Sequence, residues 1–231
     1  MLNFLNTYYV PILFVVGFFA LVAILRLKDM GRGKIMKKSL GQIGLVADNK
    51  AKKEIISELS HFPPLQDSFR MVIPNIFSGQ INGINWKIFD FSNRKKALGH
   101  VGSSGQLTKT TIAYANVPNF SFPQFILISK KIPFLSSFLE KGDDLHGHVN
   151  LIENQNFSVS FRKDISNEQT IRSFFTPEAI SYFQNMSKWI SVAVYENKFV
   201  YYNYHSGQPK AKDMRHFFSE ANEVLNLFIK R

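Results

Sequence analysis

The chain has 231 residues, no cysteine and a formal net charge of +11 at pH 7. The lack of cysteine excludes disulfides, thiol catalysis, cysteine-ligated metals and lipoprotein attachment. The positive charge is uneven, because residues 26–53 hold nine Lys/Arg against two Asp, whereas residues 54–231 hold 19 Lys/Arg against 15 Asp/Glu. The larger part of the chain is therefore only weakly basic, which argues against a nucleic-acid partner.

The first 25 residues carry no charge and no histidine. Residues 8–25 include twelve Val, Ile, Leu or Phe, and as a helix they would be about 27 Å long, close to the hydrocarbon thickness of a bilayer. A cleaved signal peptide carries positive charge before its apolar run, whereas here the charge follows the run. This pattern predicts a transmembrane anchor over residues 1–27, with Tyr8 and Tyr9 at the membrane interface.

Basic residues cluster directly after this apolar run. They are Arg26, Lys28, Arg32, Lys34, Lys37 and Lys38. Positive charge beside a membrane span favours the cytoplasmic side. The sequence thus predicts a single-pass protein of the bacterial inner (plasma) membrane, with the N-terminus outside and the C-terminal domain cytoplasmic. Anionic lipid headgroups are the expected partners of these basic side chains.

Glycines interrupt the next segment and predict a linker over residues 28–47. They are Gly31, Gly33, Gly41 and Gly44. Asp48 is suited to cap a short helix that ends at Ser60. In this segment Ala51, Ile55, Leu59 and Phe62 form one apolar stripe.

Alternation of apolar and polar residues predicts strands over 85–91, 109–117 and 124–129, and around 157–161. In the first strand, Trp86 and Ile88 face one side, and Phe89 and Phe91 face the other.

Helical patterns cover residues 168–175 and 177–188, the second with proline at its start. Residues 189–195 and 199–205 then read as a β-hairpin, in which Asn197 tolerates the turn. A final helix begins near Lys212 with one apolar face. That face consists of Met214, Phe217, Phe218, Ala221, Val224, Leu225 and Phe228.

These elements predict an α+β fold, in which an N-terminal transmembrane helix is followed by a mainly antiparallel sheet packed with a few helices. The expected segments are an anchor at 1–27, a basic juxtamembrane linker with a short helix at 28–60, and a globular α+β domain at 61–231.

Several motifs are similar to those of a group of uncharacterised bacterial membrane proteins, which have one N-terminal span and a domain of unknown function. The matching stretches are residues 81–83 running into 88–91, residues 117–125, residues 156–158, the hairpin 196–204 and the final helix. This resemblance implies a topology and brings no activity.

One constellation suggests a metal. In residues 143–148, His146 and His148 would share one face of an extended segment, and Asp143 or Asp144 could complete a site. The neighbouring glycines favour a solvated loop instead, so no metal or other cofactor is expected.

No catalytic motif is recognisable in the sequence. The favoured function is therefore a non-enzymatic binding or scaffolding module at the inner membrane, which contacts the lipid surface or a protein partner. The alternative is a membrane-bound metal-dependent hydrolase that uses His146, His148 and one of the two aspartates.

Overall fold

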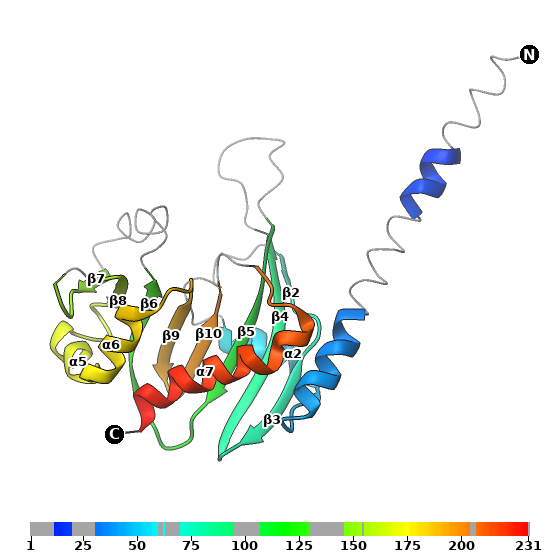
Figure 1. Cartoon of the computed structure of the whole chain (residues 1–231). Coiled ribbons are helices and arrows are strands. Elements are labelled where there is room, and N and C mark those ends of the chain that lie inside the picture. The colour runs from blue at the N-terminus through cyan, green and yellow to red at the C-terminus, as the bar shows by residue number, and fades with distance from the viewer. Residues whose placement is uncertain are drawn as a thin grey trace, which may run out of the picture.

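A ten-stranded antiparallel sheet forms the centre of the molecule (Figure 1). The computed structural model describes residues 12–19, 31–59, 62, 70–94, 107–129, 146–153, 155–203 and 207–230. The strands are β1 (Val46–Ala47), β2 (Arg70–Val72), β3 (Phe77–Ile81), β4 (Ile84–Arg94), β5 (Leu107–Asn116), β6 (Phe122–Ser129), β7 (His146–Val149), β8 (Phe157–Arg162), β9 (Ser191–Glu196) and β10 (Lys198–Tyr202). Their order is β1-β3-β4-β5-β10-β9-β6-β8-β7, with β2 paired to β4.

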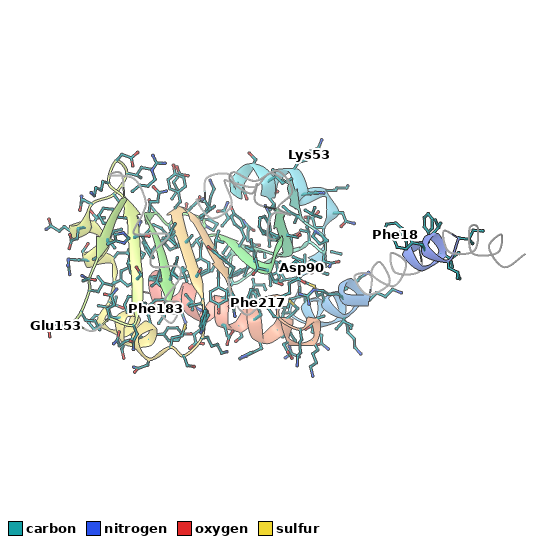
Figure 2. The ribbon with its side chains drawn as sticks, turned by 90° about the horizontal axis from the view of Figure 1, so that it is seen from above. Phe18, Lys53, Asp90, Glu153, Phe183 and Phe217 are labelled. Carbon is teal, nitrogen blue, oxygen red and sulfur yellow. The ribbon has the colours of Figure 1, made fainter. Side chains whose placement is uncertain are left out.

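Helices cover both faces of this sheet. They are residues 31–41, η1 (Asn49–Ala51), α2 (Lys52–Leu59), α5 (Glu168–Phe174), α6 (Pro177–Asn185), η2 (Ala211–Asp213) and α7 (Met214–Ile229). Seen from above, α2 lies on one side of the sheet, and α7 and the 31–41 helix lie on the other (Figure 2). The α+β class and the antiparallel sheet are therefore confirmed.

The alternation in β4 separates two hydrophobic cores. Trp86 and Ile88 belong to the core beneath α7, whereas Phe89 and Phe91 belong to the core beneath α2. Side chains alternate between the two faces of a strand, so β4 contributes to both cores at once. The predicted orientation of these four side chains is confirmed.

The final helix, α7, lies across one face of the sheet (Figure 1). All seven residues of its predicted apolar face are buried. Periodicity of 3.6 residues thus identified the packed face of α7 completely.

The predicted linker over residues 28–47 is wrong where the structure describes it. Residues 31–41 form a helix, in which Met36 and Leu40 are fully buried in the same core as α7. Its glycines do not break it, because packing of an apolar face outweighs the low helix propensity of glycine. The domain boundary predicted at residue 61 consequently falls inside the packed body.

The predicted anchor lies mostly outside the described residues, and Tyr8, Tyr9, Arg26 and Lys28 are among those not described. The part that is described, residues 12–19, is helical. Among the described stretches, no helix combines the length and apolar character that crossing a bilayer requires. We therefore correct the prediction of a transmembrane helix, and with it that of a single-pass inner-membrane protein facing the cytoplasm.

Asp48 caps the start of η1, which leads into α2, as predicted. Its Oδ1 accepts hydrogen bonds from the backbone N–H groups of Lys50 and Ala51 at 3.1 and 3.2 Å. Its other carboxylate oxygen accepts from the Ser78 hydroxyl on β3 at 2.8 Å. One side chain therefore joins the beginning of this helical segment to the sheet.

Replacing Asp48 with alanine should destabilise the protein by about 1 kcal/mol at pH 7, the usual effect of losing such a cap. The pKa of Asp48 lies below its ordinary value of 3.8, chiefly because Ser78 donates to the carboxylate. A lowered folded-state pKa means that the stabilisation is present above about pH 4 and is lost as the pH falls through the folded pKa. Urea unfolding of wild type and Asp48→Ala from neutral to acidic pH checks this, and a gap that stays constant into acid would contradict it.

Candidate functional site

The predicted metal site is not assembled among the described residues. His146 and His148 lie on β7, at the edge of the sheet, and the His148 side chain is exposed. Asp143 and Asp144 lie outside the described residues. Within the described chain, no group of three or more His, Asp or Glu side chains is placed to hold a metal ion. The hydrolase alternative gains no support from this edge of the sheet.

The predicted membrane-interface residues separate into two groups. Lys34, Lys37 and Lys38 are exposed on the 31–41 helix, and their contact with anionic headgroups stays a prediction. Arg32 instead points inward, and its side chain is only 17% exposed. All of these basic residues were predicted to face the membrane, whereas Arg32 lies on the buried face of the helix and the three lysines lie on its exposed face.

Arg32 is part of a buried polar cluster beneath the 31–41 helix. Its Nε and Nη2 lie 2.8 and 2.9 Å from the two carboxylate oxygens of Asp90, a side chain that is 1% exposed. Asn75 and Thr111 donate to the same carboxylate at 3.0 and 2.8 Å. Arg32 Nη1 also donates to the Pro209 carbonyl at 2.7 Å. Because protein groups occupy both carboxylate oxygens, this cluster fastens the helix to the sheet and is not a ligand site.

A second charged cluster fastens α2 to the opposite face. Lys87 Nζ on β4 lies 2.6 Å from Glu54 and 3.7 Å from Glu58, and 5.5 Å from the ring centroid of Tyr114. Burial raises the pKa of the Tyr114 hydroxyl well above its ordinary value, and the Glu58 carboxylate raises it further. Both glutamates belong to α2 and the lysine to β4, so we assign this cluster to packing of the helix on the sheet.

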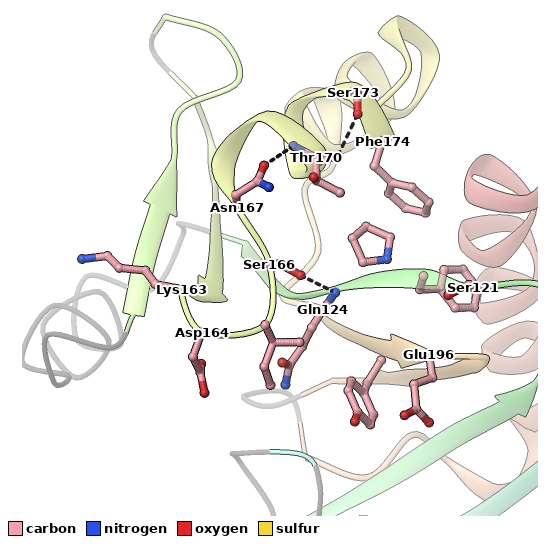
Figure 3. Close-up of a pocket in the computed structure, with 14 residues that line it drawn as sticks. Ser121, Gln124, Lys163, Asp164, Ser166, Asn167, Thr170, Ser173, Phe174 and Glu196 are labelled. Atoms are coloured by element: carbon pink, nitrogen blue, oxygen red, sulfur yellow. Dashed lines mark hydrogen bonds between the residues drawn. The ribbon is translucent and has the colours of Figure 1, made fainter.

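A further concentration of polar groups lines a cleft of about 730 Å³, which we call the β6–α5 cleft (Figure 3). Its walls are residues 121–124 at the start of β6, residues 163–167 between β8 and α5, three residues of α5, and the last two residues of β9. The three from α5 are Thr170, Ser173 and Phe174, and those from β9 are Tyr195 and Glu196. The lining combines hydroxyl, amide and charged groups with aromatic rings. Sequence reasoning did not anticipate this site.

The strand β6 is irregular where it enters the cleft. Phe122 pairs with Glu196 and Phe125 pairs with Val194, so the register shifts by one residue between them. This bulge lets Phe122 and Phe125 enter the same core although they are three positions apart. Bulges change the direction of side chains and are common beside functional sites. Pro123 within an apolar strand is the sequence signal that could have marked it.

Gln124 lies on this bulge and is the most informative residue of the cleft. Its backbone N–H donates to the Ser166 hydroxyl at 3.1 Å, as Figure 3 shows. The residue is 9% exposed, and its side-chain oxygen Oε1 is buried with no hydrogen-bond partner among the described residues. A buried acceptor that lacks a donor costs about 1–3 kcal/mol, and such groups in native proteins call for an explanation.

The wall formed by the turn after β8 is held by local hydrogen bonds. The backbone N–H groups of Ile165 and Ser166 donate to the Arg162 carbonyl at 3.1 and 2.9 Å. The Asn167 side chain caps α5 by accepting from the N–H of Thr170 at 2.8 Å. These bonds fix the turn between β8 and α5, so the cleft is formed before any ligand arrives.

Both carboxylates in the cleft have basic neighbours. Arg162 donates to Asp164 at 3.1 and 2.6 Å, and Lys198 Nζ lies 3.6 Å from Glu196.

Glu196 also occupies the turn between β9 and β10. Its φ is 54°, so Glu196, and not the predicted Asn197, adopts the left-handed conformation. Hydrogen bonding to Glu196 is the main cause that raises the pKa of the Tyr195 hydroxyl.

Comparison of the chain with protein-family models, curated proteins and solved structures finds no match. The resemblance to uncharacterised bacterial membrane proteins therefore stays a prediction.

Proposed function

We propose that the protein is a non-enzymatic binding module whose ligand occupies the β6–α5 cleft. The observation that supports this most is the buried Oε1 of Gln124, which has no donor within the described chain. A ligand that donates a hydrogen bond would satisfy it. The cleft volume of about 730 Å³ also falls within the range typical of ligand sites.

Rigidity of the cleft also favours binding. One wall belongs to the central sheet, and the other is a turn fixed by backbone hydrogen bonds and a helix cap. A site that is already formed loses little conformational entropy when the ligand arrives. Each carboxylate in the cleft has a basic side chain beside it, an arrangement that suits ion pairs at the rim of a binding site.

Replacing Gln124 with methionine should leave the ligand-free protein as stable as wild type, or more stable by up to about 1 kcal/mol. The reason is that the change keeps the side-chain volume and removes an acceptor that has no donor. Gln80→Met, at an exposed position on β3, is the matched control. Chemical denaturation of the three full-length proteins measures the effect. A loss of more than about 1 kcal/mol in Gln124→Met alone would mean that Gln124 serves packing, against the proposal.

Binding itself can be tested by screening a library of small polar metabolites for compounds that raise the melting temperature. A compound that binds the cleft should stabilise wild type and Gln80→Met, and its effect should be lost or strongly reduced in Gln124→Met. If every stabilising compound acts equally on all three proteins, the ligand does not occupy the β6–α5 cleft.

A further inference from the structure

The lining of the β6–α5 cleft also limits the chemical class of its ligand, an argument that rests on the proposed function. The first limit concerns charge. Asp164 and Glu196 already have Arg162 and Lys198 as partners. The third charged side chain of the lining is Lys163, so the cleft holds charges of both signs and does not select for a ligand of one sign.

The second limit concerns hydrogen bonding. The Oε1 of Gln124 needs a donor, and the other polar groups along the walls are mostly hydroxyls and amides, including Ser121, Asn167 and Thr170. Such groups both give and accept hydrogen bonds at close spacing. A ligand hydroxyl matches them well, because it also donates and accepts, and a ligand with several hydroxyls can engage several of these groups at once.

The third limit concerns the apolar part of the lining. Phe122, Phe174 and Tyr195 contribute rings to the walls. The two phenylalanines are only 4% and 6% exposed, so the half-buried Tyr195 offers most of the accessible ring surface, with Lys198 Nζ 5.9 Å from its ring centroid. Aromatic rings provide flat apolar surface, which the C–H face of a pyranose ring can cover while its hydroxyls remain available for hydrogen bonds. Small ligand sites commonly combine such apolar surface with a few placed polar groups.

We infer that the β6–α5 cleft binds a short, uncharged saccharide, with Gln124 Oε1 accepting a hydrogen bond from a sugar hydroxyl. The bulge in β6 places this acceptor, and Tyr195 supplies the apolar surface for a sugar ring.

Isothermal titration of the full-length protein with a defined panel tests this inference. The neutral probes are maltotriose, cellotriose and N,N′,N″-triacetylchitotriose, and the comparison probes are glucose 6-phosphate, a trimer of galacturonate and triglycine. At least one neutral trisaccharide should bind. Its affinity should fall about tenfold or more in Gln124→Met, which corresponds to the loss of one buried hydrogen bond, and should be unchanged in Gln80→Met.

Salt dependence gives a second readout. Binding of a neutral sugar should change little with added salt, because no ion pair forms between protein and ligand. Gln124-dependent binding of a charged probe or of triglycine, without binding of any neutral trisaccharide, would overturn the saccharide assignment and leave the proposed function standing. Lack of Gln124-dependent binding by every probe would also overturn the saccharide assignment, while the metabolite screen decides the proposed function separately. Release of shorter sugars during the titration would contradict the non-enzymatic function itself.

Discussion

Replacing Arg32 with leucine should lower the free energy of unfolding by about 3–5 kcal/mol, the usual effect of removing one partner from a buried ion pair. Asp90, which is 1% exposed in the wild type, would keep its hydrogen bonds from Asn75 and Thr111 and lose its cationic partner. The cost arises because water cannot reach the carboxylate to replace the guanidinium. Chemical denaturation of the full-length protein measures the effect.

Two further variants distinguish the effect of breaking the ion pair from the effect of shortening a basic side chain on this helix. Lys34→Leu changes an exposed residue on the same helix and should alter stability by less than about 0.5 kcal/mol. The double variant Arg32→Leu with Asp90→Leu should recover much of the loss, because no buried charge is then left unpaired. If Arg32→Leu is as stable as Lys34→Leu, the 31–41 helix is not fastened to the sheet through Asp90.

Replacing Phe228 with alanine should destabilise the protein by about 3–5 kcal/mol, through lost burial and the cavity left behind. Phe228 on α7 is fully buried. Its ring centroid lies within 6 Å of four others, at 5.7 Å from Phe125, 5.4 Å from Phe174, 5.6 Å from Phe175 and 5.9 Å from Phe183. These rings come from β6, from the last residue of α5 and the residue after it, and from α6, so Phe228 joins α7 to three other elements of the core.

Thermal and chemical unfolding of Phe228→Ala checks this expectation, with Glu223→Ala on the exposed side of α7 as the control. The control should change stability by less than about 0.5 kcal/mol. Because Phe174 also lines the β6–α5 cleft, we expect Phe228→Ala to weaken ligand binding as well. If the two variants are equally stable, Phe228 does not pack α7 against the sheet as described.

The elements that sequence reasoning predicted well are those with uninterrupted periodicity. The strand β4 and the helix α7 show their apolar faces over many residues, and both were located with the correct side buried. The strands β1, β2, β3 and β7 have at most five residues each, too few for alternation to be distinguished from chance. Short strands are therefore defined by their partners in the sheet, which the sequence pattern does not show.

The 31–41 helix was missed because its glycines were interpreted only as helix breakers. A Cβ at position 33 would lie 2.6 Å from the Asn75 side-chain oxygen. Glycine at this position therefore lets the helix come close to the segment that helps to hold Asp90. Close approach between segments far apart in the sequence is a tertiary effect that no local pattern reveals.

The cleft was missed for a similar reason. Gln124 reads as an ordinary polar residue at the start of a strand, and only the shifted pairing of β6 with β9 gives it a buried, unsatisfied oxygen. The cleft also needs the turn after β8, which joins β6 through the Ser166 hydroxyl. Sequence reasoning selected residues by chemical type, namely histidines and aspartates, whereas this site depends on the position of one amide.

The side-chain amide resonance of Gln124 in the isotope-labelled full-length protein provides the most direct measurement of whether a ligand occupies the cleft. The resonance can be assigned by its absence in Gln124→Met. A compound that raises the melting temperature should shift this resonance and the backbone amides of Ser166 and Thr170, and should leave the side-chain resonance of Gln80 in place. A stabilising compound that shifts resonances elsewhere and leaves those of Gln124, Ser166 and Thr170 unchanged would contradict binding in the β6–α5 cleft.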